Sequence, residues 1–365
     1  MGAARHLALL PGLRAERVTW PVPFAEGIPQ LLACRGKRVV MLASGDPFWF
    51  GAGTVLARHL TPEEWRAFPG PSVFSLAAAR MGWGLESTLC LGLHAAPLAR
   101  LRPHLAPGMR ALFTLRDGGA VAELAAYLVA EGFGTTEMTV LEALGGPRER
   151  VRTIRAEACD LGDVQHPVAC ALSVDGDGAV LTRASGQADD LFAHDGQITK
   201  RPVRALALSA LAPRAGELLW DIGAGSGSIG IEWLLSDPAT QAIGFEADPD
   251  RAARARANAA RLGVERLQII EARAPEGLEG QPLPDAVFIG GGVSQTLLER
   301  LYTLLPAGTR LVAHAVTLES EALLAQAHAN RGGSLLRIEL AQAQPIGRLR
   351  GWKAAYPVVQ WSVVL

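Results

Sequence analysis

The stretch LLWDIGAGSGSIGIEWLL, residues 218–235, constrains the fold more than any other part of the chain. Three glycines at alternate positions, Gly223, Gly225 and Gly227, separate two apolar runs, and Asp221 precedes them. This order predicts a buried strand, a tight turn and the start of a helix. Backbone without Cβ atoms lets a ligand come close, and the free N–H groups of a helix N-terminus bind polar groups. The sequence therefore predicts a small-molecule site at this turn.

The same turn also fits the G-x-G-x-x-G spacing of dinucleotide-binding folds, through Gly225, Gly227 and Gly230. Glu246, at the end of the next expected strand, does not distinguish a dinucleotide site from an S-adenosylmethionine site, because an acid there bonds ribose hydroxyls in both. Asp221 does separate them. A carboxylate two residues before the first glycine would repel a pyrophosphate, whereas S-adenosylmethionine carries an ammonium and a sulfonium. We therefore favour a methyltransferase over an NAD enzyme, and a turn without a ligand is the third alternative.

The second half of the chain alternates apolar runs with helical segments, which predicts a mostly parallel sheet with helices on both faces. The last run, residues 356–365, is expected to pair antiparallel at the end of that sheet. In the first half we expect strands over 37–44 and 136–144 and a helix over 118–133. The runs expected as strands in the second half are ELLWDIG, QAIGFEAD, RLQIIEA, DAVFIGG and GTRLVAHAV.

The length of 365 residues indicates two domains. The segment between the halves is rich in Asp, Gly and Ser and has little periodicity. We predict domains over 1–165 and 191–365, joined by a linker over 166–190. No internal repeat is visible, so the two domains are expected to differ in fold.

Composition narrows the function classes. The net charge of −1 does not favour binding to nucleic acid or to a membrane through bulk charge. The four cysteines lack CxxC spacing and the eight histidines form no HxxxH or HxH pair, so we expect reduced thiols and no metal site. With no run of eighteen apolar residues and no basic-then-apolar leader, the sequence predicts a cytoplasmic protein that does not enter a membrane.

Several motifs together resemble known methylase families. DGQITKRPVRALALSALAPRAGELLWDIGAGSGSIGIEW, FEADPDRAARARANAARLGV, IIEARAPEGL and DAVFIGGG are similar to the C-terminal methyltransferase domain of precorrin-6Y methylases. In the first half, ASGDPFWFGAG, FPGPSVFSLAAARMGW and VLEALGGPRERV resemble the tetrapyrrole methylases. The resemblance implies an α/β tetrapyrrole-methylase domain followed by a Rossmann-like class I S-adenosylmethionine-dependent methyltransferase domain.

The resemblance also implies the reaction, a step of cobalamin biosynthesis. Two methyl groups pass from S-adenosylmethionine to carbons 5 and 15 of precorrin-6Y, and the acetate arm of ring C loses carbon dioxide to give precorrin-8. Carbon 5 is assigned to the first domain, and carbon 15 with the decarboxylation to the second. Relatives of both domains suggest self-association, so we expect a homo-oligomer.

Cofactor-binding residues follow from the same resemblance. In the second domain, the turn should hold the methionine portion, Glu246 the ribose and Ala274 the adenine, while Thr199 should close over the cofactor. In the first domain, Gly45, Asp46 and Pro47 should form a loop at the cofactor cleft, with Ser72 on a later loop. The complete set expected in the second domain is Thr199, Asp221, Gly223, Ala224, Gly225, Ser226, Gly227, Glu246 and Ala274.

One departure concerns the start of the chain. Tetrapyrrole methylases begin with a strand and a glycine-rich turn, whereas MGAARHLALLPG resembles the segment that follows that strand. We therefore expect the first strand and part of the cofactor floor to be absent. This leaves open that the first domain is a non-catalytic scaffold.

The substrate carries several carboxylates, so arginines are expected at its pocket. Candidates are Arg201 and Arg204 before the turn, and Arg348 and Arg350 near the C-terminus, with a solvated surface run as the alternative for each. Trp352 is expected either to stack on the macrocycle or to plug an apolar surface. His194 and Glu276 are weak candidates for a proton donor. An RNA methyltransferase is the other enzyme class considered, but no basic domain or aromatic platform supports it.

Overall fold

The computed structural model describes residues 1–12 and 14–365, and it divides into two compact units. The first unit comprises Met1–Ala96 and Ala106–Ala179, and the second comprises Pro97–Leu105 and Val180–Leu365. Among the described residues, no helix is both long enough and apolar enough to cross a membrane.

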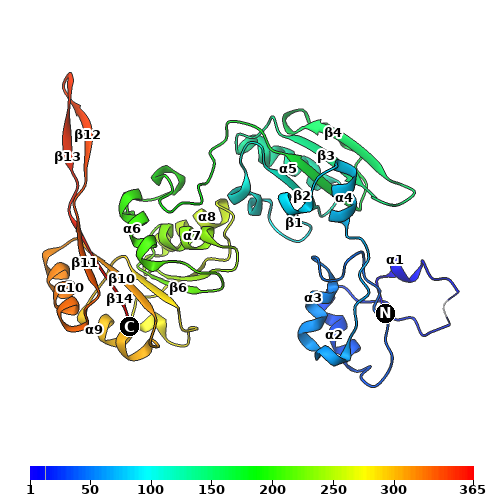
Figure 1. Ribbon diagram of the computed structural model, residues 1–365, viewed down its shortest axis with the longest axis horizontal. Coiled ribbons are helices and arrows are strands. Elements are labelled where there is room, and N and C mark those ends of the chain that lie inside the picture. Colours follow the sequence, from blue (N-terminus) through cyan, green and yellow to red (C-terminus); the bar gives the residue numbers. More distant parts are fainter. Residues whose placement is uncertain (13) are drawn as a thin grey trace. The chain divides into compact units, whose positions relative to one another are not determined.

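The first unit contains a five-stranded mixed sheet in the order β1-β2-β5-β3-β4 (Figure 1). β1 and β2 pair in parallel, and the other neighbours pair antiparallel. The strands are β1 (Leu89–Gly92), β2 (Arg110–Thr114), β3 (Glu137–Glu142), β4 (Arg150–Arg155) and β5 (Val168–Ser173). The helices are α1 (Ala4–Leu7), α2 (Gly27–Leu32), α3 (Ala52–Leu56), α4 (Val73–Met81) and α5 (Gly119–Ala130). α5 and β3 lie where the sequence predicts them.

Two expectations for this unit need correction. Residues 37–44 do not form a strand, because their one ladder contact is an isolated bridge from Leu42 to Gly2 and no neighbouring strand completes the pairing. β5, within the predicted linker 166–190, is the central strand of the sheet and is buried along most of its length. The structure therefore moves the end of the first unit from residue 165 to Ala179.

The second unit has a seven-stranded sheet in the order β11-β14-β10-β9-β6-β7-β8. The five strands from β10 to β8 are parallel, and β14 pairs antiparallel with both β10 and β11. This agrees with the alternation and the antiparallel ending expected from the sequence. The strands are β6 (Leu218–Ile222), β7 (Gln241–Phe245), β8 (Gln268–Ile270), β9 (Ala286–Ile289), β10 (Arg310–Ala315), β11 (Ser334–Ile338) and β14 (Val358–Val364).

Helices cover both faces of this sheet. Side chains of α6, α7 and α8 pack with Leu219, Phe288 and Val312 on one face, and side chains of α9 and α10 pack with Trp220, Val287 and Leu311 on the other. Neighbouring residues of a strand point to opposite faces, so the apolar strands serve two cores. The helices are α6 (Arg201–Leu211), α7 (Ser228–Ser236), α8 (Pro249–Arg261), α9 (Gln295–Leu304) and α10 (Leu318–Arg331).

A hairpin of β12 (Ala341–Ile346) and β13 (Leu349–Ala354) projects from the second unit (Figure 1). Nearly every residue of the two strands is exposed. Trp352 is 78% exposed, so it plugs no surface within the described chain.

Candidate functional site

A cavity of about 840 Å³ opens along the carboxyl edge of the second sheet. Its walls are formed by the loops that follow β6 to β10, by residues 197–200 and by residues near the ends of β11 and β14. In parallel sheets this edge is where ligands bind. The structure brings together nearly all the second-domain residues expected from the sequence: Thr199, Asp221, Gly223, Ala224, Gly225, Ser226, Glu246 and Ala274. Gly227 is not on the wall but precedes α7 directly.

The glycine turn needs residues without side chains for two different reasons. Gly223 has a φ of +72°, and a Cβ there would lie 3.1 Å from both the nitrogen and the oxygen of Gly291. Gly225 has a φ of +58°, but the nearest atoms to its Cβ position are 4.0 Å away. Gly223 is therefore required by packing, whereas at Gly225 the space over the turn is open for a ligand.

Glu246 braces the same turn. Its Oε2 accepts a hydrogen bond from the Gly225 N–H at 2.8 Å, and its Oε1 accepts one from the Asp248 N–H at 2.9 Å. The residue is 7% exposed and lies on the cavity wall at the end of β7. A carboxylate held in this way can also accept from the hydroxyls of a ligand.

Asp221 is more enclosed than the sequence suggests. It is 1% exposed, and its Oδ2 accepts a hydrogen bond from the Gly230 N–H of α7 at 3.0 Å. Burial raises the pKa of Asp221 to about 7, with the charge of Glu246 adding to the rise and the Gly230 N–H opposing it. A cation in the cavity would favour the ionised form.

Arg204, expected from the sequence to contact substrate, is instead fully buried and does not line the cavity. Its side chain donates to Glu232 on α7 and to the backbone oxygen of Gln187 at 2.6 Å. It also donates to the backbone oxygen of Thr199 and lies over the ring of Phe192 at 4.8 Å. Because Thr199 lines the cavity, Arg204 acts as a positioning residue.

Asn258 on α8 is a residue that the sequence reasoning missed. Its amide exchanges hydrogen bonds with the backbone of Ala193 in both directions and donates to the Ser226 oxygen, each at 2.9 Å. It therefore ties the loop before α6 to the glycine turn. The available signal was a single asparagine among the alanines and arginines of the expected helix.

The other predicted residues lie off the wall. Arg201 is exposed, and Arg348 and Arg350 lie on the projecting hairpin. His194 accepts from the Gly196 N–H through Nδ1 at 2.9 Å, and Glu276 lies on the short helix Glu276–Leu278. The cationic side chains that do line the cavity are Lys200, Arg251 and Arg273.

The far part of the cavity is mostly apolar, and its polar side chains are those of His314 and Tyr356. His314, at the end of β10, is 7% exposed and shares the wall with Val316, Ile338, Leu340 and Val358. The sequence contained a signal, since this histidine interrupts the apolar run that follows Arg310, close to the ligand-binding end of the strand.

In the first unit, the structure brings the two predicted cofactor loops together. Gly45 has a φ of +55°, and a Cβ there would lie 3.2 Å from the Cα of Ser72. Asp46 Oδ1 accepts from the Phe48 N–H at 2.8 Å, and Ser72 caps α4 by accepting from the Ser75 N–H at 3.1 Å. These contacts fix the loops, as expected of a cleft rim.

A cavity of about 550 Å³ lies beside these loops. It is lined by Phe48, Trp49, Phe50, Gly51, Thr54, Val55 and His94. The three aromatic side chains are between 42% and 53% exposed, which indicates an apolar binding surface. They directly follow the predicted loop Gly45–Pro47, which does not itself line this cavity.

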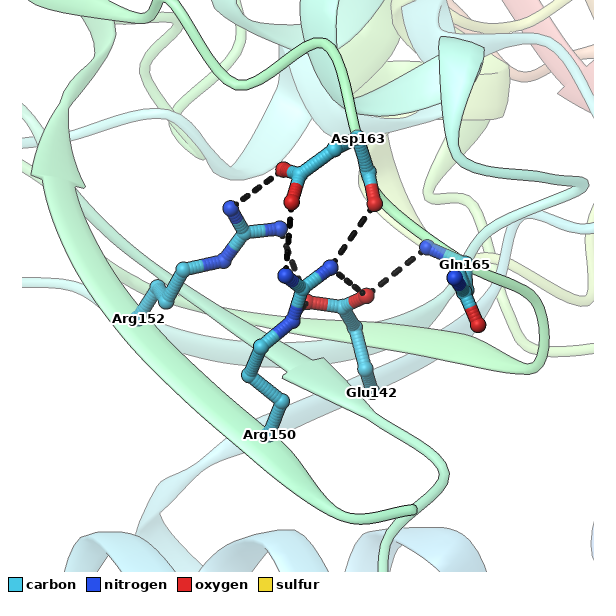
Figure 2. Close-up of polar contacts among 5 residues, drawn as sticks. All are labelled: Glu142, Arg150, Arg152, Asp163 and Gln165. Atoms are coloured by element: carbon cyan, nitrogen blue, oxygen red, sulfur yellow. Dashed lines mark hydrogen bonds and ion pairs between the residues drawn. The ribbon is translucent and has the colours of Figure 1, made fainter.

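A charged network holds the far end of the first sheet (Figure 2). Glu142, 2% exposed at the end of β3, accepts from Arg150 at 2.7 and 2.8 Å, from Arg152 at 2.9 Å and from the Gln165 N–H at 2.7 Å. Asp163 accepts from both arginines, and these bonds lower its pKa to about 2. The network anchors residues 163–165 immediately before β5, so it is structural.

Comparison with known proteins agrees with this division. Residues 26–159 match the family described as tetrapyrrole (corrin/porphyrin) methylases, and residues 190–365 match the precorrin methyltransferase domain. A precorrin-6Y C(5,15)-methyltransferase [decarboxylating] from Sinorhizobium sp. is 53% identical over 366 residues, covering 99% of this chain and 88% of the relative. The chain belongs to this methyltransferase family.

Two further relatives each align with about half of this chain. A probable cobalt-precorrin-6B C(15)-methyltransferase (decarboxylating) from Pyrobaculum calidifontis is 32% identical, covering 47% of this chain and 92% of the relative. The crystal structure of the C-terminal domain of precorrin-6Y C5,15-methyltransferase from Rhodobacter capsulatus is 53% identical, covering 51% of this chain and all of that one, with a TM-score of 0.49.

Proposed function

We propose that this chain methylates precorrin-6Y at carbons 5 and 15, with S-adenosylmethionine as the methyl donor, and removes the carboxyl group of the ring C acetate arm to give precorrin-8. The observation that carries the proposal is the 53% identity to a precorrin-6Y C(5,15)-methyltransferase [decarboxylating] over 99% of the chain. Both methylase domains are present, and the second has a cavity at its glycine turn.

The division of labour follows the relatives. A protein named for carbon 15 and for decarboxylation matches 47% of this chain, close to the length of the second domain. We therefore assign carbon 15 and the decarboxylation to the second domain and carbon 5 to the first. Gly45, Asp46, Pro47 and Ser72 are the residues assigned to its cofactor cleft.

The glycine turn fits S-adenosylmethionine. The space above Gly225 is open, Glu246 offers a carboxylate to the ribose, and Asp221 is close to its ionisation midpoint beside a cavity for a cation. Thr199 and Ala274 complete the wall expected around the methionine and adenine portions. When bound, the cofactor supplies an activated methyl group, so the protein's contribution is to align the reactants and exclude water.

The carboxylates of the macrocycle require cations near the cavity mouth. Lys200, Arg251 and Arg273 lie on the wall, and Arg251 is paired with Asp195 at 2.8 Å. Arg201, Arg348 and Arg350 stay as predictions for more distant carboxylates. The apolar aromatic cavity of the first unit suits the face of a macrocycle.

The hairpin supports self-association. Two-stranded hairpins are marginal alone in water, yet Ile346, Leu349 and Trp352 are each more than 60% exposed. We therefore infer that the hairpin packs against further copies of the chain. We place the protein in the cytoplasm, where its four cysteines would stay reduced.

The test is reconstitution with purified protein, S-adenosylmethionine and reduced precorrin-6, followed by mass spectrometry. We expect a product with two added methyl groups and one lost carbon dioxide. A protein that binds S-adenosylhomocysteine but leaves this substrate unchanged would overturn the proposal. Methylation of RNA by the same preparation would favour the alternative class.

A further inference from the structure

Three side chains on neighbouring strands of the second sheet point to the same face: Asp221, Phe288 and His314. Asp221 on β6 is the register partner of Phe288 on β9, and Phe288 is the partner of Val312 on β10. His314 follows Val312 by two residues and therefore points to the same face. Strands lie about 4.8 Å apart, so His314 is two strands, about 10 Å, from the strand that leads into the glycine turn.

His314 is held in one orientation. Its ring meets the Phe288 ring edge-on, with centroids 4.9 Å apart and planes at 88°. Its Nε2 lies 3.0 Å from Oε1 of Gln360, its register partner on β14. An amide oxygen only accepts, so Nε2 carries the proton and Nδ1 is left with a lone pair.

The surroundings keep the imidazole neutral. Burial lowers the pKa of His314, and the bond to Gln360 only partly opposes this. The charged or titratable groups on the surrounding elements include Asp221 on β6 and Arg310 on β10 itself. Tyr356, just before β14, lines the same cavity. Lys200, Arg201 and Arg204 lie at the start of α6, which packs over β9, β10 and β14. Arg204 is already paired with Glu232. A neutral imidazole with a free lone pair can accept a proton.

The cavity around His314 differs from the part near the turn. Around His314 the wall includes the apolar residues Val316, Ile338, Leu340 and Val358. The cationic residues lie elsewhere on the wall: Lys200 directly precedes α6, and Arg251 is in the first turn of α8. An apolar environment raises the energy of a carboxylate and so favours its loss as carbon dioxide. The acetate arm that reacts is thus expected at the His314 side.

Of the two reactions assigned to this domain, one releases a proton and the other consumes one. Methyl transfer from a sulfonium to a ring carbon breaks the carbon–sulfur bond, forms a carbon–carbon bond and releases one proton from the macrocycle. Decarboxylation breaks the carbon–carbon bond to the carboxylate, leaves the electron pair in the conjugated rings and consumes one proton at the former methylene carbon.

We propose that His314 is the catalytic proton carrier of the second domain: it accepts the proton released on methylation and delivers it to the carbon that loses carbon dioxide. The Nδ1 lone pair takes up the proton, and Gln360 stabilises the resulting imidazolium through Nε2. The imidazole returns to its neutral form when the methylene carbon becomes a methyl group. This inference rests on the proposed function of the second domain.

The experiment compares His314→Ala and His314→Gln with the unaltered full-length chain in single turnovers with reduced precorrin-6. We expect the ratio of decarboxylated to carboxylated methylated product to fall by about 10²–10⁴-fold, the usual contribution of a general acid–base. Added imidazole should restore decarboxylation in His314→Ala, because the cavity is open to small molecules. Calorimetry with S-adenosylhomocysteine should show unchanged affinity.

The matched control is His328→Ala, which removes a histidine on α10 that does not line the cavity. It should leave the product ratio unchanged. The inference is wrong if a His314 variant with normal S-adenosylhomocysteine affinity decarboxylates at the unaltered ratio, or if imidazole gives no rescue. If the unaltered chain itself neither methylates nor decarboxylates the substrate, the proposed function fails, which is a distinct result.

Discussion

The two glycine loops of this chain differ in what surrounds them. The turn at Gly223–Gly227 is braced by Glu246, and Asn258 ties it to the preceding loop. The loop at Gly45–Pro47 contacts the Ser72 loop but is followed by three partly exposed aromatic side chains. The glycine turn of the second unit is thus pre-organised by buried polar side chains, whereas the loop of the first unit presents an apolar surface. Substitutions around the glycine turn should therefore change the stability of the second unit and its affinity for the cofactor.

The largest effect is expected from Arg204→Ala. It leaves the Glu232 carboxylate buried without its cationic partner, which typically costs about 3–5 kcal/mol. The second unit should unfold at lower urea concentration, as followed by hydrogen exchange of α6 and α7 peptides. Arg201→Ala, on the same helix but exposed, should change stability by less than about 0.5 kcal/mol. Equal effects of the two variants would contradict the positioning role.

Gly225→Val should reduce S-adenosylhomocysteine affinity at the second site on the order of 100-fold, because the side chain enters the open space and strains a φ of +58°. Calorimetry measures the affinity. Methylation at carbon 5, which is assigned to the first domain, should still occur in this variant. The control is Gly280→Val, which has a similar φ of +74° and open surroundings but lies off the cavity wall. Loss of binding in the control would show that backbone strain alone is responsible.

Glu142→Gln should destabilise the first unit by about 1–3 kcal/mol, since two arginines lose a buried carboxylate and keep only one neutral acceptor oxygen. Although burial opposes ionisation, the bonds from Arg150, Gln165 and Arg152 hold the pKa of Glu142 below its usual value. Its contribution is thus present above the ordinary glutamate range and lost as the pH falls. Acid unfolding of the variant should be less steep, whereas Glu137→Gln, at the exposed start of the same strand, should behave like the unaltered chain.

The smallest effect concerns pH. With a pKa of about 7, Asp221 is mostly protonated at pH 6 and mostly ionised at pH 8. A ligand ammonium favours the ionised form, so S-adenosylhomocysteine affinity should rise by about tenfold over this range. Asp221→Asn should give a flat profile by calorimetry. A rise that persists in the variant would assign the titration to another group.

The sequence predicted the parallel sheet, the glycine turn and the position of Glu246 correctly, because these depend on local pattern and strand order. It did not predict the burial of Arg204, which depends on Glu232, 28 residues away and brought close only by the packing of α7 on α6. His314 was missed for a related reason: its importance comes from its neighbours Phe288 and Gln360 on other strands. Residues 37–44 have the apolar pattern of a strand but no neighbouring strand to pair with. The absence of a pairing partner cannot be read from the local sequence pattern.

The short helix Leu98–His104 belongs to the second unit although the chain on either side of it belongs to the first. Gly263, at the end of α8, packs so closely on Ala99 that a Cβ there would lie 2.2 Å from the Ala99 oxygen, and Arg100 pairs with Glu265 at 2.6 Å. No single scission of the polypeptide can therefore separate the halves cleanly. A gene fragment that encodes only residues after 180 would lack the segment that packs on Gly263 and pairs with Glu265. A linker redesign between the halves must therefore preserve residues 97–105.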